Sequence, residues 1–403
     1  MPKRLLPVRP ALAVSEPRAA GARSELGVAS ELGVAMVGHA FMGRAHSNAI
    51  RQAGHFFDLP RRLVPRVVVG RELRRAEAVR EGLGFLEASA DLDAVLARDD
   101  VHIVDIATPN DSHCELASRV LAAGKHVLCE KPLALTLAQA RAMAALAKKS
   151  KGRAGLWHNY RRAPAASLAQ RILARGELGE VRHVRATYLQ DWLSDPSASA
   201  SWRTTARTCG SGAHGDLNAH LIDMTLFLTG LSFESVSAVA QTFTKQRPAS
   251  DGKMVKVDVD DALAFLARFK GGAIGTFEAT RVAPGRKNYN RIEINGTKGS
   301  LVWNFERMNE LELFLSSDTP DAQGFRTIMC MDAKHPYSAN WWPDGHVLGY
   351  EHTFVHHLAD FVCAIHENKP FAPDFDDGFR VQAVLDAALQ SSKGGAWVDV
   401  AKK

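Results

Sequence analysis

An aspartate and a histidine stand four residues apart in the segment from Gly215 to Asp223. On an α-helix this spacing places both side chains on one face, so the carboxylate of Asp216 and the imidazole of His220 would lie side by side. An imidazole titrates near neutral pH, which suits it to accept a proton from a hydroxyl group. The pair is therefore a candidate for acid–base chemistry, and the alternative is an ordinary pair on a helix surface.

A glycine-containing turn follows a short apolar segment, residues 34–37, that we expect to form a buried strand. After the turn, a helical pattern runs over residues 44–53. This order presents backbone N–H groups and a helix N-terminus to the pyrophosphate of a dinucleotide. Ala40 replaces the second glycine of the G-x-G-x-x-G pattern, so an ordinary tight turn is the alternative. The predicted cofactor contacts in this turn are Gly38, Ala40, Phe41, Met42 and Gly43.

Strands and helices alternate along the first part of the chain. Further strands are expected at 66–69, 101–107 and 125–129, and helices at 76–81 and 136–149. This alternation is typical of an α/β Rossmann domain with a doubly wound parallel sheet, which we predict over residues 34–154. Such sheets bind ligands at the carboxyl ends of their strands. Thr108-Pro109-Asn110 and Glu130-Lys131-Pro132 follow two of these strands, so they should line one crevice with Gly38.

Lys131 is the candidate positive charge for a reaction in which Asp216 and His220 handle the proton. Oxidising a secondary alcohol with a nicotinamide requires a base for the hydroxyl proton and a positive charge near the developing alkoxide. Lys131 precedes Pro132, which keeps it extended rather than helical. His220 suits the base, and Asp216 can orient that imidazole or bind the substrate. The alternative for Lys131 taken alone is a solvated loop lysine.

The chain changes character after residue 154. Segments with the alternation of strands lie at 181–188, 257–269, 273–281, 291–295, 300–305 and 310–314. Short turns at Gly271-Gly272 and at residues 296–299 join some of them. Neighbouring strands joined in this way form antiparallel sheets. We therefore predict a C-terminal α+β domain over residues 155–403, with a large, mostly antiparallel sheet and helices on one face.

An ordered set of motifs resembles the Gfo/Idh/MocA oxidoreductases, the glucose-fructose oxidoreductase and inositol dehydrogenase family. The motifs are Gly43-Arg44-Ala45-His46, Thr108-Pro109-Asn110 with His113, Glu130-Lys131-Pro132, Asn159-Tyr160-Arg161-Arg162, and Gly212-Ala213-His214-Gly215-Asp216 with His220 and Asp223. The resemblance covers residues 34–400. It implies an NAD(P)-dependent dehydrogenase with Lys131, Asp216 and His220 as the catalytic group, and a homodimer or homotetramer that forms through the open face of the sheet.

The resemblance also implies further cofactor and substrate contacts. The cofactor contacts are Thr108, Pro109, Asn110, His113, Glu130, Lys131 and Asn159. The segment Tyr188-Leu189-Gln190-Asp191-Trp192 followed by Trp202-Arg203 is most similar to the levoglucosan and glycoside 3-dehydrogenase branch. Aromatic faces stack on sugar rings, and Asp and Arg side chains bind hydroxyl groups. The substrate candidates are Tyr160, Arg161, Asp191, Trp192 and Arg203, with Asp216 and His220; packing is the alternative for each. Residues 281–288 form a basic segment that we expect to be a solvated loop, and the alternative is contact with an anionic substituent of the substrate.

The residues after the second strand bear on the choice of cofactor. NAD enzymes usually place an acid there to bind the ribose 2′-hydroxyl. Here Gly70-Arg71 follows the strand, and Arg71 can pair with a 2′-phosphate, which favours NADP. A shift of one residue would bring Glu72 to this place and favour NAD. We expect NAD or NADP as the cofactor, with Gly70 and Arg71 among its contacts.

Composition limits the classes of function. The 403 residues are 46% hydrophobic and 23% charged, as in globular enzymes. The net charge of +6 is scattered without basic runs among aromatics, which argues against nucleic acid as a partner. No apolar run approaches the ~20 residues of a membrane span. Residues 1–33 lack periodicity and a signal-peptide core, so we expect a disordered leader.

Cysteine and histidine usage points to a reduced enzyme without a metal. The five cysteines are widely spaced and form no C-x-x-C motif, which favours the cytoplasm. His352, His356 and His357 lie near Glu351, but the spacing offers no third ligand. We therefore expect helix-surface histidines at these positions and no metal site.

Three hypotheses about function follow. The first is an NAD(P)-dependent dehydrogenase that acts on a secondary hydroxyl of a sugar, glycoside or cyclitol. The second is a redox-neutral glycoside hydrolase, in which transient oxidation permits elimination of the glycosidic substituent before re-reduction. The third is a cofactor-sensing regulator on the same fold. The complete set of Lys131, Asp216 and His220 argues against the third hypothesis.

Overall fold

The structure is a computed structural model in which residues 30–402 are described. Residues 1–29 of the predicted leader, residues 1–33, lie outside the described residues. The first strand, β1 (Glu31–Val37), begins three residues before the expected Val34, and its residue Leu32 is fully buried. The ordered N-terminal domain therefore includes residues 31–33.

The N-terminal domain is a six-stranded sheet in the order β3-β2-β1-β4-β5-β6, with every neighbouring pair parallel. The other strands are β2 (Arg62–Val69), β3 (Glu87–Ser89), β4 (Ile103–Ile106), β5 (His126–Cys129) and β6 (Ala154–Leu156). The helices are α1 (Phe41–Phe56), α2 (Leu73–Leu83), α3 (Leu92–Leu96), α4 (His113–Ala122) and α5 (Leu137–Lys149). The strand order reverses between β1 and β4, where doubly wound sheets bind ligands. The predicted Rossmann fold is confirmed.

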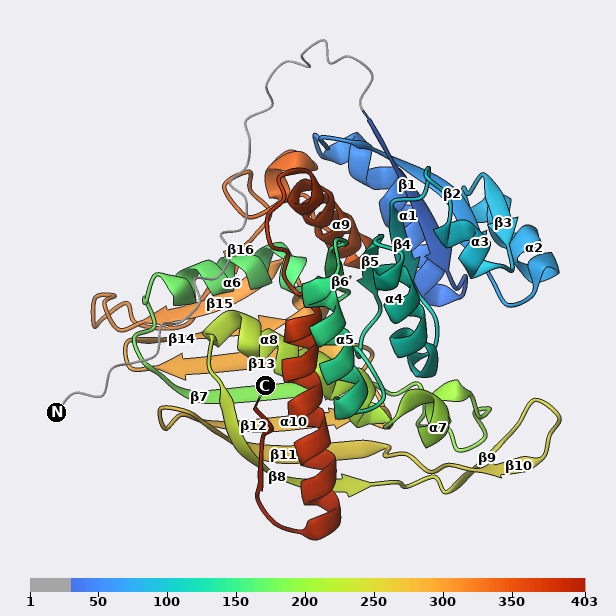
Figure 1. Ribbon diagram of the computed structural model, residues 1–403. Coiled ribbons are helices and arrows are strands. Elements are labelled where there is room, and N and C mark those ends of the chain that lie inside the picture. The colour runs from blue at the N-terminus through green and yellow to red at the C-terminus, as the bar shows by residue number, and fades with distance from the viewer. Residues whose placement is uncertain (1–29, 403) are drawn as a thin grey trace.

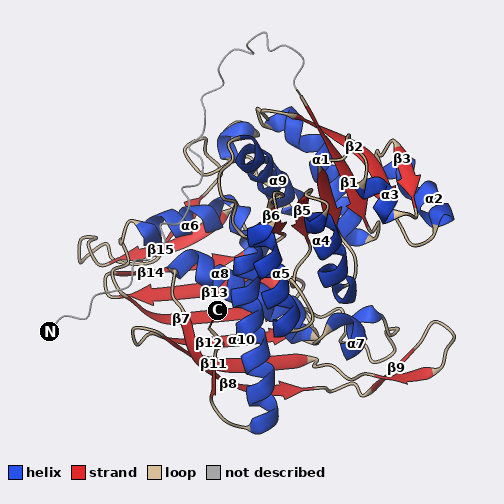
Figure 2. Ribbon diagram, in the orientation of Figure 1, coloured by secondary structure: helices blue, strands red, loops and turns tan. Residues whose placement is uncertain are grey.

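Helices cover both faces of this sheet, which explains why its strands read as almost continuous apolar runs (Figure 2). Successive residues of β1 enter opposite cores. Val34 and Met36 pack among residues of α1 and α9 (Tyr350–His366). Ala35 and Val37 pack among residues of α4 and α5. The sheet is therefore rigid at the point where the glycine turn leaves β1.

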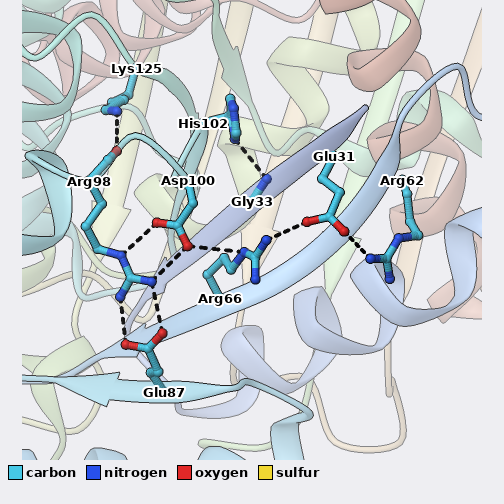
Figure 3. Close-up of polar contacts among 9 residues, drawn as sticks. All are labelled: Glu31, Gly33, Arg62, Arg66, Glu87, Arg98, Asp100, His102 and Lys125. Carbon is cyan, nitrogen blue, oxygen red and sulfur yellow. Dashed lines mark hydrogen bonds and ion pairs between the residues drawn. The ribbon is translucent and has the colours of Figure 1, made fainter. Parts of the chain in front are cut away.

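A network of ion pairs lies at the amino-terminal edge of the sheet (Figure 3). Arg66 contacts Glu31 at 2.5 Å and Asp100 at 3.4 Å. Arg98 contacts Asp100 at 2.8 Å and Glu87 at 2.7 Å. These partly exposed pairs connect β1, β2, β3 and the loop before β4, and each contributes little free energy by itself. The network lies at the edge opposite the expected ligand crevice.

The C-terminal domain is a nine-stranded sheet in the order β16-β15-β14-β13-β7-β12-β11-β8-β17. Its strands are β7 (Val181–Leu189), β8 (Phe233–Gln241), β11 (Ala262–Phe269), β12 (Ile274–Thr280), β13 (Tyr289–Gly296), β14 (Gly299–Asn304), β15 (Glu310–Leu315), β16 (Arg326–Met329) and β17 (Val398–Asp399). The β7–β12 pair is parallel and its other pairs are antiparallel. A separate hairpin joins β9 (Gln246–Pro248) and β10 (Met254–Lys256).

Three helices cover one face of the large sheet (Figure 1). They are α6 (Pro164–Ala174), α8 (Ala219–Thr229) and α10 (Phe375–Gly394). Their apolar residues share one core with the inward residues of the strands. The predicted α+β domain with a mostly antiparallel sheet is therefore confirmed.

The two long C-terminal helices also belong to the core of the first domain. Phe354 and Phe361 of α9 pack in the core that contains α1. Phe375 and Phe379 of α10 pack in the core that contains α5. A boundary at residue 155 falls inside β6 of the parallel sheet, and residues of α9 and α10 belong to the hydrophobic cores of the first domain.

Some elements differ from their predicted ranges. β8 was not expected, because serine and alanine blur its alternation. The strand predicted from residue 257 begins at Ala262. Helix α1 begins at Phe41, inside the glycine turn, rather than at residue 44. Within residues 30–402, no helix is long and apolar enough to cross a membrane.

Candidate active site

Lys131 and Asp216 meet between the two domains. Lys131 follows β5, and Asp216 lies in a π-helical turn, His214–Asn218, that leads into α8. The Nζ of Lys131 donates to the Oδ1 of Asp216 at 2.7 Å and to the backbone oxygen of Asp216 at 3.0 Å. The lysine is 85% shielded from solvent, so its ammonium is fixed in place rather than solvated. The structure brings together two of the three residues predicted to be catalytic.

Arg281 holds the other oxygen of the same carboxylate. It follows β12, and its Nη2 donates to Oδ2 of Asp216 at 2.9 Å. Arg281 is 2% exposed, so the prediction of a solvated loop is wrong for this residue. Burial raises the pKa of Asp216, but the charges of Lys131 and Arg281 outweigh burial and hold that pKa well below its usual range. Asp216 is therefore a carboxylate held between two cations.

His220 lies one helical turn farther along, next to Tyr160. Their ring centroids are 4.4 Å apart at an interplanar angle of 25°. Burial and the charge of Lys131 hold the pKa of His220 well below its usual value. The imidazole is therefore neutral at neutral pH, which is the protonation state that a general base requires.

Asp216 does not orient His220 as expected. Among the described residues, no hydrogen bond joins Asp216 to His220, because the carboxylate faces Lys131 and Arg281 instead. The packing of Tyr160 against the imidazole fixes the ring. Asp216 and His220 are therefore close, as the helical spacing predicted, but they are not hydrogen-bonded to each other.

Tyr160 begins a chain of hydrogen bonds that lies at the end of β7 and the start of β13. Its hydroxyl lies 2.9 Å from that of Tyr188, which donates to Oδ1 of Asn288 at 2.6 Å. The Nε2 of Gln190 donates to the same oxygen at 2.9 Å. Burial raises the pKa of Tyr160 to about 12. Tyr160 therefore remains a neutral phenol beside His220.

Arg161 is placed differently from its predicted role as a substrate contact. Its guanidinium is 5% exposed and donates to both carboxylate oxygens of Asp223, at 2.8 and 2.5 Å. A second carboxylate, that of Asp377, lies 3.3 Å away. The guanidinium donors are thus directed into a buried ion cluster that joins α8 to α10. This corrects the prediction: the buried carboxylates compete for Arg161, and it stabilises the fold behind the site.

The remaining substrate candidates lie at the rim of the site. Asp191 forms an ion pair with Lys287 at 2.6 Å. Trp192 is 44% exposed, and the guanidinium carbon of Arg281 lies 5.4 Å from the centroid of its ring. Arg203 stacks on Trp202 and contributes to the low pKa of Asp216. Trp192 and Arg203 therefore lie close to Arg281 and Asp216, and Asp191 is paired with the loop that contains Lys287.

The glycine turn leaves the close backbone approach that a dinucleotide needs. Gly38 has a φ of +96°, and a Cβ there would lie 2.6 Å from the oxygen of Ala107. A Cβ on Gly43 would lie 2.6 Å from the oxygen of Gly38. Ala40 caps α1, and Phe41 is exposed and stacks parallel to Tyr350 at 6.5 Å. A side chain at either glycine would clash with the backbone, so this tight turn requires glycine at both positions. The turn leads into the N-terminus of α1, whose backbone N–H groups fit a bound pyrophosphate.

Several predicted cofactor contacts brace the crevice through their own hydrogen bonds. The ring of His113 lies between the oxygens of Thr108 and Pro132, at 3.0 and 2.9 Å. The Nδ2 of Asn110 donates to the oxygen of Cys209 at 3.1 Å. The Nδ2 of Asn159 donates to Oγ1 of Thr353 at 2.7 Å. Thr108, Pro109 and Lys131 remain at the carboxyl edge of the sheet, where the crevice was predicted.

His46 contacts Lys131 indirectly, through Glu130, and the sequence analysis gave it no role. Its Nδ1 lies 2.8 Å from Oδ2 of Asp105, and its Nε2 lies 3.1 Å from Oε1 of Glu130. Burial lowers the pKa of His46, but the two carboxylates outweigh burial and raise it to about 9. The other oxygen of Glu130 accepts from the backbone N–H of Lys131 at 3.1 Å. His46 therefore positions Glu130, and through it Lys131.

His356 of α9 is hydrogen-bonded through both ring nitrogens. The Nδ1 of His356 lies 2.8 Å from the oxygen of Arg162, and Nε2 accepts from Trp341 at 2.7 Å. His356 and His357 are fully buried, so the expectation of surface histidines is wrong for both. Within residues 30–402, no group of side chains is suited to hold a metal ion.

Comparisons with known proteins place this geometry in context. Residues 32–158 match the oxidoreductase family with the NAD-binding Rossmann fold, and residues 167–302 match the GFO/IDH/MocA C-terminal domain. Levoglucosan dehydrogenase of Pseudarthrobacter phenanthrenivorans is 39% identical over 92% of this chain and 98% of its own. Inositol 2-dehydrogenase of Rhizobium meliloti is 27% identical over 74% of this chain and 81% of its own.

Solved structures agree with these relatives. A structure of levoglucosan dehydrogenase in complex with NADH and L-sorbose has a TM-score of 0.90 at 40% identity, covering 93% of this chain and all of the other. An oxidoreductase domain protein from Kribbella flavida has a TM-score of 0.90 at 49% identity, with the same coverage.

Proposed function

The chain belongs to the Gfo/Idh/MocA family of NAD-binding oxidoreductases, and we propose that it oxidises a secondary hydroxyl of a sugar, glycoside or cyclitol. The observation that carries the proposal is the assembly of Lys131, Asp216 and neutral His220 at the carboxyl edge of the parallel sheet. The identity of 39% to a levoglucosan dehydrogenase supports a substrate of this class. A bound nicotinamide supplies the hydride acceptor.

The protonation states assign the roles of the side chains. His220 is neutral, so it accepts the hydroxyl proton of the substrate at an imidazole nitrogen. Lys131 is paired with Asp216 and donates a hydrogen bond toward the substrate oxygen as negative charge develops there. Asp216 remains ionised and holds the lysine in position. Tyr160, Asp191, Trp192 and Arg203 are the proposed contacts to the substrate.

The test is a screen of levoglucosan, monosaccharides, inositols and glycosides with NAD and NADP. Reduced nicotinamide should accumulate together with an oxidised sugar or cyclitol. Release of an aglycone without net reduced cofactor would contradict the proposal and support the redox-neutral hydrolase. Cofactor binding without turnover on any substrate would support a regulator, and His220→Asn provides the inactive control.

We also propose that two copies associate through the open face of the nine-stranded sheet. Val239, Leu266 and Ile274, on three adjacent strands, are 68%, 51% and 54% exposed on this face. Apolar side chains gathered on one face of a sheet favour burial against a partner. Sedimentation should give a dimer or tetramer that Leu266→Glu dissociates, and a monomeric parent protein would contradict this.

A cytoplasmic location completes the proposal. No disulfide joins the five cysteines, all of which lie within the described residues. Reduced cysteines are typical of cytoplasmic proteins. Fractionation of cells that produce the chain should recover it with cytoplasmic markers.

A further inference from the structure

The ends of β1 and β2 lie side by side at the carboxyl edge of the Rossmann sheet. Val37 and Val69 are paired in register, and the N–H of Gly38 donates to the oxygen of Val69 at 3.0 Å. The residues that follow β2 are therefore adjacent to the glycine turn. In a dinucleotide-binding fold this is the place of the adenosine ribose.

No acidic side chain stands directly after β2. Gly70 occupies that position, and its N–H donates to the oxygen of Ser89 at 3.0 Å. A Cβ on Gly70 would lie 3.1 Å from Nε2 of His39 and 3.3 Å from Cβ of Ala76. The imidazole of His39, from the glycine turn, therefore takes the space in which a side chain at position 70 would stand. A carboxylate to bind a ribose 2′-hydroxyl is missing here.

The nearest acid in sequence is already paired. Glu72 precedes the first residue of α2, and its Oε2 lies 2.9 Å from Nε of Arg75. Arg71 is exposed, and it forms no hydrogen bond or ion pair with any described residue. The positive charge of Arg71 beside the ribose position thus has no partner among the described residues. The carboxylate of Glu72, which would otherwise repel a phosphate, is paired with Arg75.

We propose that Arg71 and His39 form a subsite for the 2′-phosphate of NADP, so that this chain prefers the phosphorylated cofactor. The guanidinium fork of Arg71 can bind two phosphate oxygens. The imidazole of His39 can donate to a third oxygen from the opposite side. The proposal rests on the cofactor binding stated under the proposed function. It deepens that function by naming the group that distinguishes the two nicotinamide cofactors.

The test compares two adenosine fragments that differ in the 2′-phosphate. Adenosine 2′,5′-bisphosphate and adenosine 5′-monophosphate are titrated into the protein, and binding is measured by calorimetry. The parent protein should bind the bisphosphate at least about 10-fold more tightly. Arg71→Ala should lose about 10- to 100-fold in affinity for the bisphosphate, with little change for the monophosphate. His39→Ala should lose part of the same preference.

Arg182→Ala is the control, because this exposed arginine of β7 lies in the other domain, away from the ends of β1 and β2. It should leave the ratio of the two affinities unchanged. Equal affinity of the parent protein for both fragments would overturn the 2′-phosphate subsite and leave dinucleotide binding intact. An equal loss for both fragments in Arg71→Ala would also overturn it. Failure of NADH, NADPH and both fragments to bind would overturn the proposed function together with this inference.

Discussion

The Nζ of Lys131 and the Oδ1 of Asp216 are 2.7 Å apart, although one residue follows a strand of the parallel sheet and the other begins a helix that covers the antiparallel sheet. The candidate active site therefore exists only when the two domains are packed together. The shared cores around α9 and α10 keep that packing fixed. This contact between domains is the premise of the predictions that follow.

Lys131→Met should reduce turnover by at least about 10²-fold, because the site loses the cation next to the developing alkoxide. Binding of the dinucleotide should change less, since the glycine turn is untouched. Steady-state kinetics and a cofactor titration check the two effects separately. Lys149→Met, an exposed lysine of α5, is the control and should behave as the parent. Parent-like turnover in Lys131→Met would remove Lys131 from the reaction.

His220→Asn should lose about 10²- to 10⁴-fold in turnover and keep its affinity for the cofactor, as expected when an acid–base group is removed. The parent should show no loss of oxidation rate near pH 6.5, because the pKa of His220 lies well below that value. Lys131 contributes to this low pKa, so Lys131→Met should move the acid limb of the pH profile upward. A parent profile that falls through pH 6.5 would contradict the neutral imidazole.

Arg281→Met should lower turnover about 10-fold or more, because it removes one of the two cations that hold the carboxylate of Asp216. The pKa of Asp216 should rise without this charge, so the residual activity should be lost at a higher pH than in the parent as the pH falls. Arg286→Met, an exposed residue of the same loop, is the control. An unchanged pH profile with unchanged turnover in Arg281→Met would show that Lys131 alone fixes Asp216.

The Rossmann fold and the α+β domain could be predicted from the sequence, whereas the association of Lys131 with Asp216 was implied only by the resemblance to a family. The periods of apolar residues mark strands and helices, and parallel strands bring their carboxyl ends to one edge by topology. The proximity of Asp216 and His220 also follows from local spacing. The two folds and the proximity of Asp216 to His220 depend on short stretches of chain, whereas the contact of Lys131 with Asp216 joins two domains.

The errors concern residues whose role depends on distant partners. Arg281 belongs to a segment that reads as a basic loop, yet it is buried because Asp216 lies opposite it in the folded chain. Arg161 was expected at the substrate, but Asp223 and Asp377 capture it. His46 had no assigned role because its partners come from distant parts of the chain, Asp105 from β4 and Glu130 from the end of β5. One feature of the sequence indicated a buried partner for Asp105, because it is a charged residue within an otherwise apolar strand.

His46 should make the stability of the protein depend on pH in an identifiable way. Its pKa in the folded protein is about 9, above the ordinary value of 6.5 that applies to the unfolded chain, because Asp105 and Glu130 favour the charged ring despite burial. Its contribution to stability is therefore fully present below pH 6.5 and is lost as the pH rises through 9. Urea unfolding of the parent should show a loss on the order of 1–3 kcal/mol across this window.

His46→Gln should be less stable at pH 6.5 and should lack this pH-dependent loss, whereas His55→Gln, an exposed histidine of the same helix, should retain it. A folded His46→Gln should also lose turnover, because Glu130 binds the N–H of Lys131 and is no longer held by an imidazolium. The same pH slope of unfolding free energy in the parent and in His46→Gln would refute a charged His46. Normal turnover in a folded variant would mean that Lys131 needs no support from this histidine.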